Sequence, residues 1–177
     1  MPGLAVPTPA SVVPGGYITA ALWNAGVYNL GLFLLNAPLF EGYQSAAQSI
    51  ANGSVTAIGI DTTVIDTYGG HSNTTNNSRY TVQSGAGGWY QVTCALGFAA
   101  NASGARALEI HKNGGVIKLG YDGTDDSRTD IAAALQATAI VQLAAGDYVE
   151  GFAYQTSGGA LATNPSATGM TVIWKHA

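Results

Sequence analysis

The chain has 177 residues, of which 47% are hydrophobic, only 9% carry a charge and 24 are glycine, and its net charge is −4. This composition excludes a disordered chain, which would be poor in apolar residues and rich in charge, and predicts a turn-rich fold made of strands. With six basic residues it also lacks the basic patch that a nucleic-acid partner requires.

The first forty residues contain no charged side chain. Residues 1–17 include four prolines, which fix φ and remove a backbone donor, so this segment is predicted to be an extended arm. The apolar run 18–35 is interrupted by Thr19, Asn24 and Asn29 and has no basic residues before it. We therefore expect neither a membrane span nor a signal peptide here.

Residues 19–36 are predicted to form a helix, with Thr19 as its N-cap and Asn36 and Pro38 closing it. Its apolar residues extend nearly all round, which indicates burial on several sides. Either the helix packs on its own domain, or copies of it pack together or dock on a larger particle, and the lack of charge favours the second reading. The predicted attachment or oligomerisation residues, spaced along this helix, are Trp23, Val27, Leu30, Phe33 and Leu34.

From residue 45 onward, short runs rich in Val, Ile, Thr and Tyr alternate with Gly, Asn, Asp and Ser. Alternating apolar residues from Tyr90 to Phe98 predict one buried strand face, and Asn113–Gly114 predicts a tight hairpin. The run 132–146 has helical propensity, but its second half alternates, so we interpret it as strand. The expected domains are therefore an arm and helix at 1–44 and an antiparallel β-sandwich or barrel at 45–177. The expected strands lie at 54–61, 89–100, 106–115, 116–122, 134–155 and 170–176.

No combination of acid, base and nucleophile is visible in the sequence, so we expect no enzyme and no cofactor. His71 stands alone in a polar loop, and His111 shares a strand face with Glu109 as a surface pair. Cys94 is the only cysteine, which excludes an intrachain disulfide. Calcium is the one metal with any support, because carboxylates gather in a loop at Asp122, Asp125 and Asp126.

Residues 54–177 resemble a C1q/TNF-type jelly roll. The resemblance rests on motifs in a characteristic order, namely Gly88, Tyr90 and Val92, then Asn113 and Gly114, then Leu143, Gly146, Asp147 and Val149, then Gly158 and Gly159, then the strand from Met170 to Lys175. It implies a mainly β, non-enzymatic homotrimer. The ending Trp174, Lys175 and His176 departs from the family pattern and leaves the packing of the last strand in question.

The N-terminal part is similar to the opening of small tail and virion proteins of tailed phages that infect actinobacteria. The matching residues are Trp23, Asn24, Phe33, Leu34 and Pro38. The resemblance implies a virion structural protein on the particle surface, in which residues 1–44 contact other virion proteins and carry a trimeric jelly roll.

Two roles within the virion remain open. A tail-associated fibre tip or adhesin would contact a host-cell glycan through its loops, with Tyr68, His71 and Tyr121 as the predicted receptor-facing residues. A capsid decoration protein would make nearly all its specific contacts through residues 1–44. A different class of function is a carbohydrate-binding module or host-receptor adhesin that is not built into a capsid.

Overall fold

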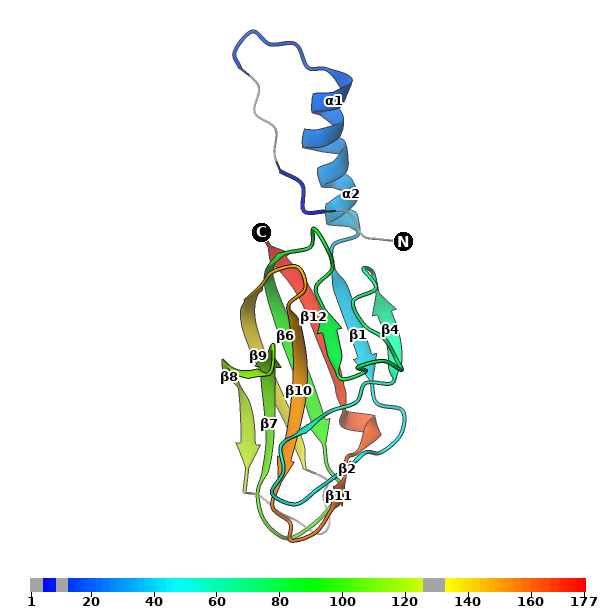
Figure 1. Cartoon of the computed structure of the whole chain (residues 1–177), viewed down its shortest axis with the longest axis vertical. Coiled ribbons are helices and arrows are strands. Elements are labelled where there is room, and N and C mark those ends of the chain that lie inside the picture. The colour runs from blue at the N-terminus through cyan, green and yellow to red at the C-terminus, as the bar shows by residue number, and fades with distance from the viewer. Residues whose placement is uncertain (1–4, 9–12, 126–132) are drawn as a thin grey trace.

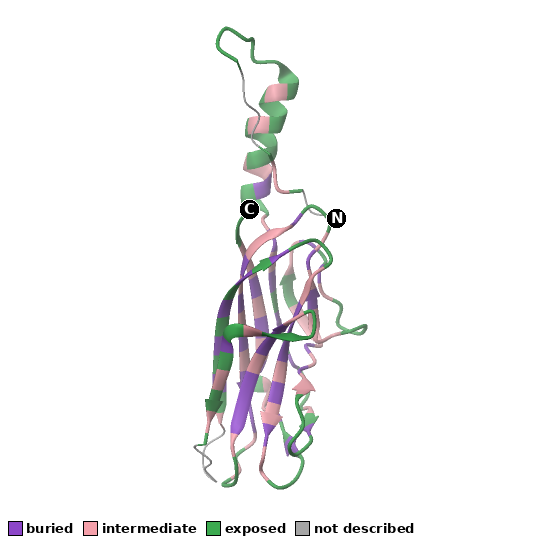
Figure 2. Cartoon of the chain, turned by 60° about the vertical axis from the view of Figure 1, so that its left-hand side comes forward, coloured by how far each residue is buried: buried purple, intermediate pink, exposed green. Residues whose placement is uncertain are grey.

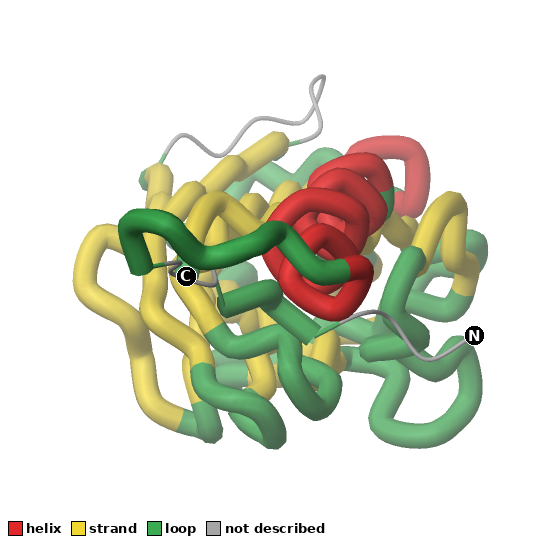
Figure 3. The backbone as a smooth tube through the Cα atoms, turned by 90° about the horizontal axis from the view of Figure 1, so that it is seen from above, coloured by secondary structure: helices red, strands yellow, loops and turns green. Residues whose placement is uncertain are grey.

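The structure is a computed structural model, and it describes residues 5–8, 13–125 and 133–177. Two antiparallel sheets pack face to face, and a helix stands clear of them at one end (Figure 1). Viewed from above, this helix is seen nearly end-on in front of the strands (Figure 3). No helix among the described residues is both long and apolar enough to cross a membrane.

The larger sheet has five strands in the order β4-β1-β12-β6-β9, all paired antiparallel. Its strands are β1 (Leu39–Tyr43), β4 (Thr62–Asp66), β6 (Gly88–Gly97), β9 (Ala134–Leu143) and β12 (Gly169–His176). Strand β12 stays paired to its end, where Trp174 lies opposite Tyr90 and His176 opposite Trp89. The unusual ending of the sequence is therefore paired with β6, although the register shifts between Trp174 and His176.

The second sheet has the order β3-β10-β7-β8, and β5 pairs with β10 in addition. Its strands are β3 (Thr56–Ala57), β5 (Arg79–Thr81), β7 (Arg106–Lys112), β8 (Gly115–Thr124) and β10 (Tyr148–Gln155). A small separate ladder joins β2 (Ser49–Ile50) to β11 (Leu161–Ala162), and the 3-10 turn η2 (Pro165–Ala167) leads into β12. The predicted Asn113–Gly114 hairpin joins β7 to β8, and the predicted strand 54–61 is reduced to β3.

The helix is confirmed, but it is not regular. It runs as α1 (Ala20–Trp23), the π-helical turn η1 (Asn24–Tyr28) and α2 (Asn29–Leu35). Thr19 caps it as expected, because its Oγ1 accepts a hydrogen bond from the backbone N–H of Leu22 at 3.2 Å. The π turn widens the helix around Gly26 and has no signal in the sequence pattern.

The core lies between the two sheets. The buried face that was predicted for the strand from Tyr90 to Phe98 is confirmed. Tyr90, Val92, Cys94, Leu96 and Phe98 are all buried. Strand β9 is also confirmed, because its residues alternate between exposed and buried along its whole length, as a strand with one face in the core must. Figure 2 shows the same division, with buried residues inside the sandwich and a helix that is exposed over most of its length.

The structure corrects the expected boundary at residue 44. Strand β1 lies inside the predicted N-terminal element, yet it occupies the second position of the larger sheet between β4 and β12. Gly42 allows this position, because a Cβ there would meet the backbone oxygen of Thr62 at 2.9 Å. The sandwich therefore begins at Leu39, and a truncation at residue 44 would remove one of its internal strands.

Asp147 ties two hairpin turns together. Its carboxylate accepts hydrogen bonds from Lys112 Nζ at 2.8 Å, Asn113 Nδ2 at 2.8 Å and the backbone N–H of Ala144 at 2.9 Å. These bonds, that of Lys112 above all, lower the pKa of Asp147 from 3.8 to about 2. The Gly146–Asp147 motif noted in the sequence thus has a structural reason, since the aspartate fixes the β7–β8 turn against the start of β10.

We expect Asp147→Asn to lower the free energy of unfolding by about 1–2 kcal/mol at pH 7. A depressed folded-state pKa means that the stabilisation is present above pH 3.8 and is lost as the pH falls toward 2. The difference between wild type and variant should therefore shrink below pH 3.8. Urea unfolding at pH 7 and pH 2.5 measures it, and a difference that is equal at both pH values would contradict the assignment.

Candidate interaction surfaces

The larger sheet presents one face to the core and the other outward, and the outward face forms three rows. Cross-strand pairing defines them as Leu39, Ile173, Gln91 and Ile140, then Glu41, Thr171, Thr93 and Thr138, then Tyr43, Gly169, Ala95 and Gln136. We call these twelve residues the open face. Glu41 is its only charged residue, and Ile140 is 55% exposed. An outward sheet face with so little charge is typical of a surface that meets another protein.

The open face is hollowed over its second and third rows. The hollow has a volume of about 1140 Å³, and Tyr43, Thr93, Gln136 and Pro165 are among the residues that line it. Thr93 Oγ1 and Thr138 Oγ1 lie 3.0 Å apart and satisfy each other across neighbouring strands. The lining is mostly small or uncharged, so the hollow suits a protein ridge better than a charged ligand.

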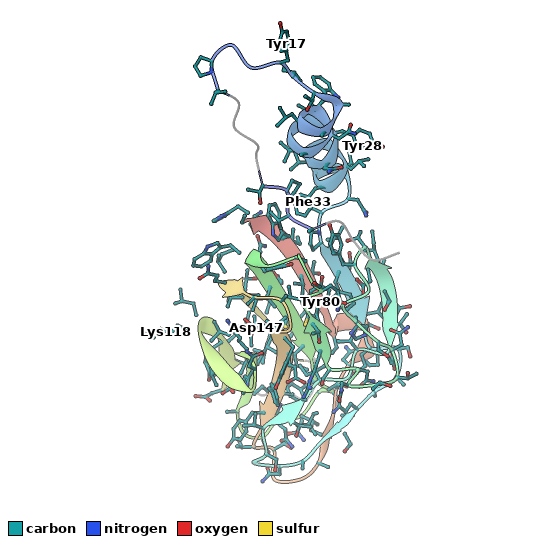
Figure 4. The ribbon with its side chains drawn as sticks, turned by 45° about the horizontal axis from the view of Figure 1, so that its top comes forward. Tyr17, Tyr28, Phe33, Tyr80, Lys118 and Asp147 are labelled. Carbon is teal, nitrogen blue, oxygen red and sulfur yellow. The ribbon has the colours of Figure 1, made fainter. Side chains whose placement is uncertain are left out.

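A ridge of exposed apolar residues lies beside the edge of this face. Strand β8 carries Val116, Leu119 and Tyr121, all well exposed, and we call these three residues the β8 ridge. Leu119 is 88% exposed and has a φ of +66°, a left-handed conformation that is rare and costly for leucine. The ridge adjoins β9, because Asp122 Oδ2 accepts a hydrogen bond from the backbone N–H of Gln136 at 2.9 Å. Figure 4 shows Lys118, from the same strand, at the margin of the molecule.

The helix presents a third surface. Trp23, Val27, Leu30 and Leu34 are exposed, as their predicted role requires, and we call these four the helix stripe. Phe33 is a correction, because it is only 1% exposed and its ring packs edge-on against Trp174 with centroids 4.8 Å apart. It therefore seats the helix on β12 and is not available to another molecule (Figure 4).

The receptor-facing predictions have different outcomes. Tyr68 was expected on an exposed loop, but it is 3% exposed and belongs to the core, and this burial raises the pKa of its hydroxyl. His71 is not a free loop residue either, because its ring nitrogens lie 2.7 Å from the carbonyl oxygen of Arg79 and 2.9 Å from that of Ile60. Tyr121 is exposed as expected, and its contact with a receptor stays a prediction.

Several polar side chains of the second sheet and its neighbouring loop bond one another. Glu150, which is buried, accepts hydrogen bonds from Ser78 Oγ at 2.6 Å and Arg79 Nε at 3.1 Å. His111 pairs with Glu109 at 2.8 Å as predicted, but the expectation that the pair lies on the surface is wrong, because the His111 ring is buried against Phe152. These contacts link strands and the neighbouring loop.

The calcium prediction stays untested. Asp122 is half-buried and Asp125 is exposed, whereas Asp126 lies outside the described residues. Within the described ranges, no cluster of three or more His, Cys, Asp or Glu side chains could hold a metal ion. Asp61, a carboxylate outside this loop, accepts hydrogen bonds from Ser45 and Thr62. Burial opposes its ionisation, but these hydrogen bonds outweigh it and lower its pKa.

The paired antiparallel sheets, their strand order and the closing strand β12 define a jelly roll of the C1q/TNF type. Solved structures that share this fold include the globular domain of zebrafish complement 1qA protein, with 10% identity and a TM-score of 0.57, covering 78% of this chain and 98% of that one. Murine APRIL has 12% identity and a TM-score of 0.59 over the same shares of the two chains. Eiger TNF from S. frugiperda has 12% identity and a TM-score of 0.54, covering 78% and 90%.

At these identities the comparison establishes the fold alone. No protein-family model matches the chain, and no curated protein matches it. The predicted fold class is confirmed, and the function has to be argued from the three surfaces.

Proposed function

We propose that this chain is a non-enzymatic structural protein of a bacteriophage virion. It is a homotrimer whose jelly rolls are displayed on the particle surface and whose N-terminal segment attaches them there. The observation that carries this proposal is the helix, which is uncharged and largely exposed, and whose one buried residue, Phe33, joins it to the core of the jelly roll. Such a surface is costly for an isolated protein in water and is accounted for if other molecules cover it.

The open face and the β8 ridge support the trimer. They are different surfaces of one molecule, a hollow and a protruding edge, so one copy can receive the ridge of the next. Contacts of this head-to-tail kind close into a ring when the rotation fits. The number three follows from the C1q/TNF resemblance, and the nearly uncharged open face allows three copies to meet without like-charge repulsion.

Ile140→Asp tests the trimer. A carboxylate at this end of the row beside Gln91 has no charged partner once the interface covers it, so we expect the dissociation constant to rise at least about 100-fold. Light scattering across a dilution series of the full chain measures this. Val55→Asp is the matched control, because Val55 is about as exposed but lies outside the open face and the ridge. A wild-type chain that is monomeric at micromolar concentration, or equal effects of the two variants, would overturn the proposed interface.

The virion assignment needs a separate test. An antibody raised against the jelly roll should detect the chain in gradient-purified particles of the phage that encodes it. Labelling at the tail would support the fibre-tip or adhesin role, and labelling over the capsid would support decoration. If purified particles from cultures that express the chain do not contain it, the virion role is wrong.

Tyr121 favours a second candidate, a carbohydrate-binding module or host-receptor adhesin outside any capsid. Its exposed ring lies at the sandwich edge, where an aromatic face can stack on a sugar. In that case the purified chain should bind host cells without particles, and Tyr121→Ala should abolish this binding.

A further inference from the structure

We propose that the helix stripe is the seam of a three-helix bundle, formed by the same helix in three copies of this chain. The inference rests on the trimer proposed above and names the partner of a surface that the jelly rolls leave open. Trp23, Val27, Leu30 and Leu34 follow one another at intervals of four, three and four residues. Leu30 and Leu34 lie one α-helical turn apart in α2, which is the spacing by which helices pack side by side on their own copies. The π turn at Asn24–Tyr28 turns Trp23 to one side of this line, where it is still exposed.

The lack of charge suits a symmetric partner. In a bundle around a threefold axis each side chain meets its own equivalents, so any charge near the seam would face a like charge. None of the first forty residues is charged, and the stripe itself consists of one aromatic and three aliphatic side chains. The surface therefore accepts its own copy without an electrostatic cost.

Two glycines on the helix support a close neighbour. Gly26 and Gly31 each destabilise a helix by about 0.5–1 kcal/mol relative to alanine. Among the described residues nothing explains them, because a Cβ at either position would meet no atom within 4 Å beyond the neighbouring helix backbone. Close approach of a second backbone gives both glycines, and the wide π turn around Gly26, a structural reason.

The attachment of each helix to its own jelly roll determines which helices can meet in a trimer. Phe33 packs on Trp174 of β12, and the helix leads through three residues into β1, so it is attached to two strands of the open face. A trimer assembled through that face brings three helices out at the same end of the molecule. The second and third helices are then at millimolar effective concentration. A helix of this length is marginal alone and gains stability by packing.

In such a bundle, side chains outside the helix stripe stay exposed and can contact the particle. Tyr17, Tyr28 and Leu35 are exposed and lie off the stripe, so they stay on the outside of a bundle. Figure 4 shows Tyr17 at the far end of the segment and Tyr28 projecting from the helix. The stripe thus holds the copies together, and these outer side chains make the attachment.

Cross-linking of single-cysteine variants tests the bundle in the full chain. Burial raises the pKa of the Cys94 thiol to about 12 and keeps it from reagents, so an added cysteine is the only reactive one. Leu30→Cys places a thiol in the seam, and Asn29→Cys places one on the other side of the same turn as the matched control. With a short bis-maleimide, we expect Leu30→Cys to form chain-to-chain dimers at least about tenfold faster than Asn29→Cys.

The outcomes separate this inference from the trimer. Rapid self-cross-linking of Leu30→Cys alone supports the bundle. A trimer by light scattering in which neither variant, or both equally, cross-links overturns the bundle and leaves the trimer standing. A monomer at all concentrations overturns the trimer itself. Cross-linking of Leu30→Cys to another protein in purified particles, with no self-product, shows that the particle occupies the stripe and also overturns the bundle.

Discussion

Replacing Phe98 by alanine should lower the free energy of unfolding by about 3–5 kcal/mol per subunit. The ring is 0% exposed at the end of β6, and its backbone makes an isolated bridge to Thr163. The guanidinium of the buried Arg106 lies 5.8 Å from the ring centroid, bonded to the carbonyl oxygens of Ser103 and Ala105. The truncation therefore leaves a cavity beside a charged group that has little room to move.

Urea unfolding at a fixed protein concentration measures this loss, because dissociation of a trimer also contributes to its stability. Tyr17→Ala serves as the control, because Tyr17 is exposed and lies outside the open face, the β8 ridge and the helix stripe. It removes an aromatic ring of similar size from an exposed position, and should change stability by less than about 0.5 kcal/mol in the monomer. A loss below about 1 kcal/mol for Phe98→Ala would mean that the site is not a packed core.

Gly104→Ala should be the most damaging of the glycine substitutions at left-handed positions. Gly104 has a φ of +73°, and a Cβ there would lie 1.9 Å from the carbonyl oxygen of Thr156. That oxygen cannot retreat easily, because the backbone of Thr156 and its Oγ1 are bonded to the backbone of Ala105 at 3.1 and 2.8 Å. We expect a loss of about 3–4 kcal/mol, the sum of the cost of the left-handed conformation and of the overlap.

Gly53→Ala separates these two causes. Gly53 has a φ of +71°, but a Cβ there would meet nothing within 4 Å. The backbone cost is therefore the same, about 1–2 kcal/mol, while the steric cost is absent. Thermal or urea unfolding of both variants gives the difference directly. Equal losses would show that the loop at Gly104 moves away from Thr156 and that only the backbone conformation matters.

The fold was predictable wherever one local pattern dominates. Alternation identified the β6 and β9 strands, Asn113–Gly114 identified a hairpin, and Thr19 with Pro38 bounded the helix. Strand β1 was missed because it follows an apolar helix directly and its pattern is only five residues long. Its place in the sheet depends on pairing with β12. Even the two paired residues that are closest in sequence, Tyr43 and Gly169, are 126 residues apart (169 − 43). No local signal carries that information.

The candidate surfaces were less predictable than the fold. The helix stripe followed from spacing, but Phe33 was misassigned because only the three-dimensional position of Trp174 shows what covers it. Tyr68 follows a polar strand end and precedes a largely exposed loop, yet its ring belongs to the hydrophobic core. The open face could not be found from the sequence, because its rows join residues from four separate strands.

The scarcity of charge on the open face and the helix has a consequence for how copies find one another. With Glu41 as the only charged group among the twelve open-face residues, and none along the helix, these surfaces carry no complementary charge to guide the encounter. Association then depends on apolar burial against the repulsion between chains of net charge −4, so sodium chloride should strengthen the affinity slightly by screening that repulsion, and sulfate should strengthen it further. A trimer held by these contacts would therefore not be dissociated by high concentrations of sodium chloride.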